Sequence, residues 1–111
     1  MALDFQVNLL PEEAEKIITH EIEEKSITGM LIDKYVVNGD NGKVCMVSVY
    51  EKHYMRADTR LTLTVVIDNM EGVTRVHCIA GGGGEAFFRF DFGASESFEY
   101  SVEKILSQYK I

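Results

Sequence analysis

The sequence is poor in basic residues, in cysteine and in proline, and it has no long apolar run. Eleven lysines and arginines stand against 18 aspartates and glutamates, which gives a formal net charge of −7. This balance repels phosphate backbones, so no nucleic-acid partner is expected. No apolar run approaches the ~20 residues that span a bilayer, and no secretory signal is recognisable at the start. We therefore expect a cytoplasmic protein with no membrane contact.

The few cysteines and histidines form no motif for metal binding or redox chemistry. Cys45 and Cys78 lie in apolar, strand-like surroundings and make no CxxC pair. His20, His53 and His77 belong to different predicted elements, with no HxH or HExxH spacing. We expect two buried free thiols, no metal ion and no cofactor.

What is present is typical of one globular domain over residues 1–111. Hydrophobic residues make up 46% of the chain and charged residues 26%, which argues against disorder. The negative charge is uneven, because residues 1–28 contain seven acids and only two bases. The middle of the chain is nearly neutral.

One helix is predicted near each end of the chain. Pro11 followed by EEAEKIITHEIEEK predicts the first, because proline suits the first helical turn and glutamates suit the positive end of the helix dipole. The small residues from Gly93 to Ser97 open the second. Both helices are amphipathic. The apolar stripe of the second consists of Phe98, Val102, Ile105, Leu106 and Tyr109.

Between the helices the pattern predicts four strands and a short fifth. Residues 61–67 show the clearest two-residue alternation, and NGDNG at residues 38–42 is a strong hairpin signal. The turns are too short for parallel crossovers, so the strands form an antiparallel meander. The predicted strands cover residues 30–37, 43–54, 60–68 and 73–80, with the fifth over AFFRFDF at residues 86–92.

The two helices most simply cover one face of this sheet. The predicted fold is therefore a two-layer α+β domain of order α-β-β-β-β-(β)-α. Both faces of the second strand carry apolar side chains, so the uncovered face of the sheet is partly apolar. Such a face is typical of self-association or ligand contact. We expect a homodimer that forms through the sheet or through an edge strand.

Four consecutive glycines, Gly81 to Gly84, are the most unusual local feature. A P-loop requires a lysine after the last glycine, and a dinucleotide loop requires a following helix, whereas here an acid and a strand-like run follow. The glycines therefore indicate a loop or bulge with positive φ angles. Because such a run loses much backbone entropy on folding, a close approach of another group to this backbone is a second interpretation.

The best polar cluster lies beside the glycine run. If Val76 and Cys78 face the core, Arg75 and His77 face the other way, and Arg89 joins them. An ordinary group of surface ion pairs is the competing interpretation, and no residue is assigned a catalytic role. The candidate ligand-binding residues are Arg75, His77, Gly81, Gly82, Gly83, Gly84, Glu85 and Arg89. An aromatic-lined cavity between helices and sheet stays open as a further alternative.

The run GGGGExxFRFDFGASESF, together with the closing SVEKILSQY helix, resembles a family of short bacterial proteins classed only as a domain of unknown function. The resemblance covers most of the chain from the Pro11 helix onward. It implies a small cytosolic bacterial protein, and it assigns no activity, cofactor or site residue.

The sequence favours a non-enzymatic module that self-associates or binds a protein partner through its sheet. The alternative is a small-molecule binding protein or enzyme with a site around the glycine run. Anion binding at the helix start near Ser95 is a third hypothesis, weakened by the acids around it.

Overall fold

The computed structural model describes residues 2–54, 59–82 and 92–111. In chain order the strands and helices are β1 (Leu3–Val7), α1 (Pro11–Lys25), β2 (Met30–Asn38), β3 (Val44–Tyr54), β4 (Thr59–Asp68), β5 (Thr74–Gly81) and α3 (Phe92–Ile105). Short 3-10 turns lie at Asp40–Gly42 and Ser107–Tyr109.

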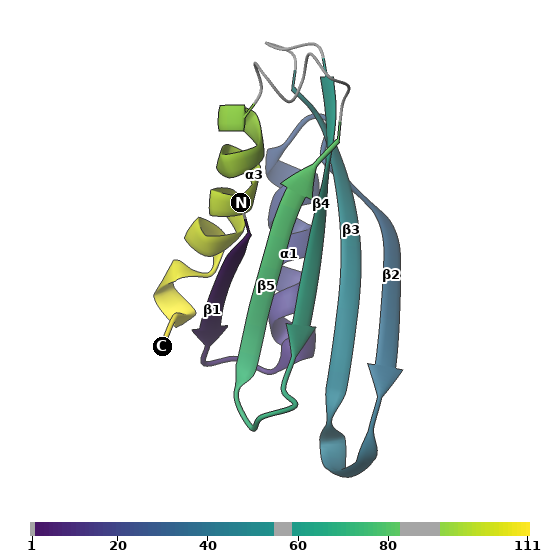
Figure 1. Cartoon of the computed structure of the whole chain (residues 1–111), viewed down its shortest axis with the longest axis vertical. Coiled ribbons are helices and arrows are strands. Elements are labelled where there is room, and N and C mark those ends of the chain that lie inside the picture. The colour runs from purple at the N-terminus through teal and green to yellow at the C-terminus, as the bar shows by residue number, and fades with distance from the viewer. Residues whose placement is uncertain (1, 55–58, 83–91) are drawn as a thin grey trace.

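The five strands form one antiparallel sheet in the order β1-β5-β4-β3-β2. Strands β2 to β5 are a meander, and α1 carries the chain from β1 at one edge to β2 at the other. Both helices pack on the same face, and α1 is seen behind the sheet in Figure 1. The predicted two-layer α+β class is confirmed.

The N-terminal strand β1 is an element that the predicted order lacked. Its residues Leu3, Phe5 and Val7 face the core, and Phe5 lies opposite Val76 of β5. The strand is only five residues long, and its partner lies about 70 residues further along the chain. The predicted fifth strand, AFFRFDF, lies outside the described residues except for Phe92, which begins α3.

The core lies between the two helices and one face of the sheet. The alternating residues of β4 are fully buried, and the apolar stripes of the helices pack on them. The buried apolar side chains are Phe5, Val7, Ala14, Ile18, Ile22, Tyr50, Leu61, Leu63, Val65, Ile67, Val76, Cys78, Phe98, Val102 and Leu106.

A polar chain of contacts connects α1 to the sheet inside this core. Glu15 is buried, and its carboxylate accepts hydrogen bonds from Lys34 Nζ (3.1 Å) and Thr19 Oγ1 (2.8 Å). The Tyr50 and Thr19 hydroxyls share a further hydrogen bond of 2.8 Å. Buried polar groups are tolerated when they are paired in this way. The network fixes which face of β2 turns toward the helices, because it holds Lys34 on that side.

Gly29, between α1 and β2, is required because no side chain fits there. A β-carbon at this position would lie 2.7 Å from the carbonyl oxygen of Ile22 and 2.9 Å from Ser26 Cβ. We expect Gly29→Ala to lower the free energy of unfolding by about 1–3 kcal/mol, since the backbone must shift. Urea unfolding measures this change. Gly39→Ala is the matched control, because its β-carbon would meet Lys43 Cβ at an ordinary 3.4 Å. Equal effects at the two glycines would contradict the steric explanation.

Candidate functional site

Arg75 and His77 lie on the open face of β5, as the alternation predicted, and both have carboxylate partners. Arg75 donates to Asp68 through Nε (3.2 Å) and Nη2 (3.0 Å), and its Nη1 lies 3.0 Å from Glu71. The hydrogen bonds and charge of Asp68 raise the pKa of Arg75. His77 Nδ1 contacts the carboxylate of Asp4, the residue opposite it in β1. The contacts with Asp68 and Asp4 cross between neighbouring strands on the sheet surface, and Glu71 reaches Arg75 from the β4–β5 turn.

The structure places Arg75 far from the beginning of the glycine run. Gly81 ends β5 six residues after Arg75, which is about 20 Å along an extended strand. A shallow hollow of about 710 Å³ does border Arg75 and His77, but its other walls come from β1, Asp68 and the last two residues of the chain. The other candidate ligand-binding residues lie outside the described part of the chain: Gly83, Gly84, Glu85 and Arg89. That they belong to a binding site therefore stays a prediction.

Gly82 has a clear conformational reason to be glycine. Its φ angle of +118° is one that side chains rarely adopt, as the sequence interpretation of this run required. A β-carbon there would also lie 3.2 Å from the carbonyl oxygen of Arg60. The group that lies close to the Gly82 backbone is thus the backbone of β4 in the same chain.

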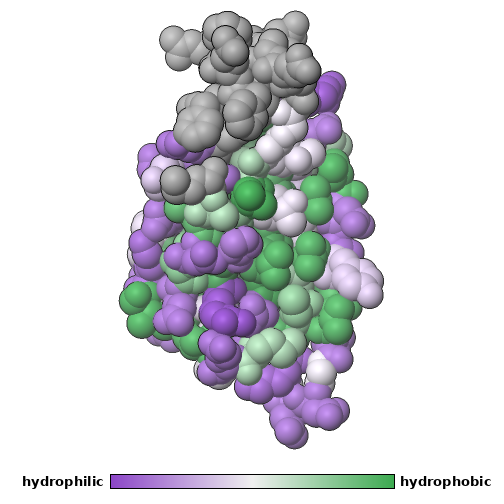
Figure 2. Space-filling model, viewed as in Figure 1, coloured by the Kyte–Doolittle hydropathy of each residue, from purple (hydrophilic) through white to green (hydrophobic). Residues whose placement is uncertain are grey.

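The open face of the sheet carries a continuous apolar area at its centre. It runs from β2 across β3 to β4, where Tyr35, Val47 and Val66 lie opposite one another in the sheet register, and Ile79 extends it onto β5 at the position diagonal to Val66. We call this the open-face patch, and its members are Tyr35, Val37, Cys45, Val47, Val49, Val66 and Ile79. Figure 2 shows hydrophobic side chains gathered on this face, with hydrophilic ones toward β1.

Cys45 belongs to this patch and is only half-buried, so the prediction of two buried thiols is wrong for this residue. The strand pattern could not decide which face of β3 would be covered. Cys78, on the helix side of β5, is buried as predicted, and burial raises its pKa to about 12.

The outer strand β2 is exposed on both of its faces. Tyr35 and Val37 on the open face are 64% and 45% exposed, and Val36 on the helix side is still 40% exposed. Met30 and Ile32 add two more exposed apolar side chains at the start of the strand. The helix layer therefore does not cover β2, although its sequence is that of a buried strand.

The two edges of the sheet differ sharply. At the β1 edge the end of the chain pairs with the strand, since Asn8 N–H donates to the Tyr109 carbonyl (2.7 Å) and Ile111 N–H to the Gln6 carbonyl (3.0 Å). At the β2 edge Leu31 N–H donates to Glu23 (3.2 Å), next to a bulge between Leu31 and Asp33. From residue 33 to residue 38, no described residue pairs with the outer edge of β2.

Several charged side chains of the open face are paired at the margins of the open-face patch. Arg60 pairs with Glu51 (3.0 Å), and Arg75 pairs with Asp68 (3.0 Å) toward β1. Helix α1, on the opposite side, has six acids and two bases. Much of the negative charge of the chain thus lies on α1, on the side of the sheet opposite the open-face patch.

Two kinds of site are absent from the described part of the chain. Among residues 2–54, 59–82 and 92–111, no group of three metal-ligating side chains is close enough to hold an ion. Neither of the described helices has the length and apolar character needed to cross a bilayer.

Comparison with known proteins gives a family and no activity. No curated protein and no solved structure matches the chain. The profile of one family, described as a family of unknown function (DUF6054), matches residues 1–110. That match covers nearly the whole chain, and so the chain belongs to the DUF6054 family.

Proposed function

We propose that the chain is a non-enzymatic module of the bacterial cytoplasm that forms a homodimer through β2. The observation that carries this proposal is the apolar, unpaired outer strand itself. An exposed strand edge is a template for pairing with another strand, and none of the described residues covers the outer edge of β2 between residues 33 and 38.

Pairing along the edge explains the exposure better than stacking of two open faces. A stacked dimer would cover Tyr35 and Val37 but would leave Val36 in water, because Val36 is on the helix side. A second β2 strand alongside the first brings its own side chains to both faces at once. It also satisfies the backbone groups that stacking would leave unpaired.

Symmetry limits the register of such a pair. When two copies of one strand pair antiparallel about a two-fold axis perpendicular to the sheet, one residue lies directly opposite its own copy. Asp33 or Lys34 at that position would bring like charges together, which is unfavourable. The remaining central positions of the open edge are Tyr35 and Val36. In these two registers Lys34 lies opposite Val36 or Asn38 of the other copy, so it meets no like charge there.

The dimer should be of moderate strength. Six residues of ladder with the flanking side chains make a small interface, of the kind found in weak, reversible complexes, and we expect a dissociation constant of about 1–100 µM. Self-association in this range responds to the concentration of the protein, which suits a module that assembles reversibly.

Sedimentation velocity between about 1 and 200 µM tests the proposal, and a shift from monomer to dimer is the expected result. The register is tested by two single-cysteine positions, Tyr35→Cys and Val36→Cys, in a chain that also carries Cys45→Ser. Side chains directly opposite in an antiparallel pair are close enough for a disulfide. One of the two variants should form a cross-linked dimer on mild oxidation.

Met70→Cys in the same background is the control, since Met70 is 42% exposed on the β4–β5 turn, away from β2. Only monomer across the concentration series, or equal cross-linking at all three positions, would reject the dimer.

The alternative function, small-molecule binding around the glycine run, has less support. Arg75 and His77 are occupied by carboxylates, and the hollow beside them is not lined by Gly81 or Gly82.

A further inference from the structure

The hydrogen bonds of the β2–β3 hairpin show which backbone groups of β2 point outward. Val44 directs its carbonyl to the β4 side, where it accepts a hydrogen bond of 3.3 Å from the residue after β4. Alternate residues of an antiparallel strand bond to opposite neighbours, so Cys45 directs its backbone groups to β2 and to its partner Val37. Gly39 also faces inward, since its N–H donates to the Lys43 carbonyl (2.8 Å). The even-numbered residues between them therefore face outward.

Three residues of β2 thus present N–H and C=O groups along the open edge: Lys34, Val36 and Asn38. None of the described residues pairs with these groups. They are spaced two residues apart, which is the spacing that a second antiparallel strand requires.

Leu31 is a fourth outward position, and the chain itself occupies it. The bulge gives β2 two residues for one in β3, so Leu31 has the place next to Asp33 in the ladder. Its N–H donates to the Glu23 carboxylate of α1 (3.2 Å). Glu23 is exposed, so its carboxylate lies where the end of a neighbouring strand would lie. The part of the edge that is open to a second strand begins after Leu31.

We propose that Glu23 determines the register of the β2 dimer and that Val36 lies on its two-fold axis. This inference rests on the dimer proposed above. With this axis, Val36 exchanges two hydrogen bonds with its own copy, and Lys34 exchanges two with Asn38 of the other copy. All three outward residues of the open edge are then paired. Leu31 lies beyond the end of the other strand, and Glu23 already satisfies its N–H.

The register with Tyr35 on the axis requires the position that Glu23 occupies. In that register Asn38 of one copy faces Leu31 of the other, and its carbonyl competes with Glu23 for the same N–H. Without the carboxylate, the outward residues would all be paired in this register too. Glu23 is therefore the group that excludes it.

The side chains favour the same register. With Val36 on the axis, Tyr35 lies opposite Val37 of the other copy, and pairs of an aromatic and a β-branched residue are favourable. With Tyr35 on the axis, Val37 lies opposite Asp33, which places a carboxylate beside an apolar side chain.

Disulfide cross-linking of the full chain tests the register. In the Cys45→Ser background, Val36→Cys is expected to cross-link at least about fivefold faster than Tyr35→Cys. Directly opposite cysteines are within reach of a disulfide, whereas the diagonal pair in Tyr35→Cys is about 7–8 Å apart. Faster cross-linking of Tyr35→Cys in a chain that dimerises would overturn the register and leave the dimer standing. Monomer at every concentration would reject both.

Glu23→Ala tests the role of the carboxylate. It frees the Leu31 N–H of both copies, so the ratio of Val36→Cys to Tyr35→Cys cross-linking should fall about fivefold or more. Glu23→Gln retains a carbonyl acceptor and should keep the ratio within about twofold. Glu24→Ala makes the same change of charge at the next exposed position of α1 and should leave the ratio unchanged. An unchanged ratio in Glu23→Ala, or an equal fall in Glu24→Ala, would contradict the proposal.

Amide exchange of Leu31, measured by NMR at a concentration where the chain is monomeric, tests the hydrogen bond to Glu23 alone. This N–H should exchange at least about fivefold faster in Glu23→Ala than in the unsubstituted chain. Glu24→Ala should leave the rate unchanged. Equal rates in the unsubstituted chain and in Glu23→Ala would mean that the carboxylate does not hold this N–H. The proposal would then be wrong even if the chain dimerises through β2.

Discussion

Tyr35→Asp is expected to raise the dissociation constant of the homodimer at least 30-fold, the factor that corresponds to about 2 kcal/mol. The tyrosine lies at or next to the proposed two-fold axis. The substitution therefore removes apolar surface from the interface, together with the contact between this side chain and the residue opposite it in the other copy. The two new carboxylates would lie close together across the axis, where like charges repel. Sedimentation velocity over the same concentration series measures the change.

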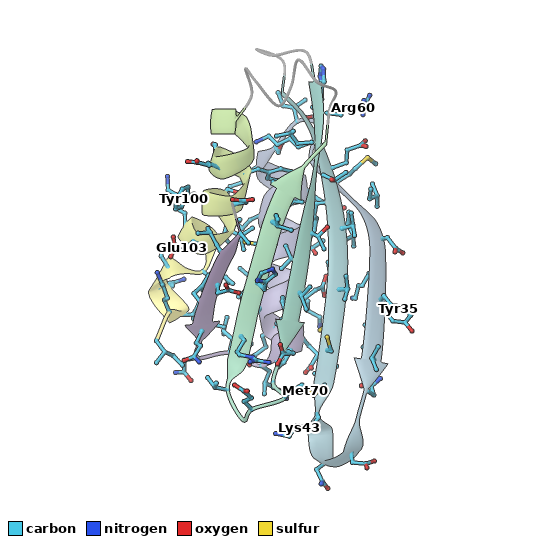
Figure 3. All side chains as sticks on the ribbon, viewed as in Figure 1. Tyr35, Lys43, Arg60, Met70, Tyr100 and Glu103 are labelled. Atoms are coloured by element: carbon cyan, nitrogen blue, oxygen red, sulfur yellow. The ribbon has the colours of Figure 1, made fainter. Side chains whose placement is uncertain are left out.

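Tyr100→Asp is the matched control for this variant. It makes the same substitution and the same change of charge, and Tyr100 is 53% exposed against 64% for Tyr35. The two tyrosines lie on opposite sides of the molecule, on α3 and β2 (Figure 3). Tyr100→Asp should leave the dimer intact. If it dissociates the dimer as strongly as Tyr35→Asp does, the added negative charge is responsible and β2 is not the interface.

Alkaline solution is expected to destabilise the fold by several kcal/mol, because two buried acids must lose their protons. Burial is the main cause that raises the pKa of Cys78 from 9.0 to about 12 and that of Tyr50 from 10.0 to about 12. The folded state therefore keeps both protons to higher pH than the unfolded chain does. The resulting stabilisation is complete below pH 9 for Cys78 and below pH 10 for Tyr50, and it is lost as pH rises to about 12.

At about 1.4 kcal/mol for each pKa unit, the loss amounts to about 4 kcal/mol for the thiol and about 3 kcal/mol for the phenol. Urea unfolding at pH 8, 10 and 11 should show the free energy of unfolding falling with pH. In Cys78→Ala the fall should be much smaller, although the variant starts less stable at pH 8 because of the cavity.

Val76→Ala controls for the truncation itself. Val76 is buried on the same face of β5 as Cys78, and it has no proton to lose. Its variant should therefore be less stable at every pH and keep the full dependence on pH. If Cys78→Ala has the same dependence as Val76→Ala, titration of the thiol is not the cause.

The local sequence pattern correctly predicted most helices and strands, but it did not predict β1 at the edge of the sheet. Residues 61–67 alternate strictly and are the core strand β4, and Pro11–Lys25 forms the helix that its proline and glutamates predict. Strand β1 has the same alternation over five residues, but its assignment depends on pairing with β5 across most of the chain. No local pattern contains that information.

Missing β1 left the other edge of the sheet wrongly assigned. The predicted meander already made residues 30–37 an outer strand, whereas β1 pairs with β5 on the opposite side of the sheet and brings Asp4 to His77. The exposure of Tyr35 and Val36 follows from that order of strands, not from their own apolar sequence.

The pairing of the last residues of the chain with β1 has a consequence for the size of any assembly. A sheet with two free edges can add further copies without limit and grow into a fibre. Here Gln6 and Asn8 already bond to Ile111 and Tyr109, so this end of β1 is closed to another copy. If two copies pair through β2 as proposed, residues 109–111 would hinder further growth at the β1 edge and favour a dimer over a fibre.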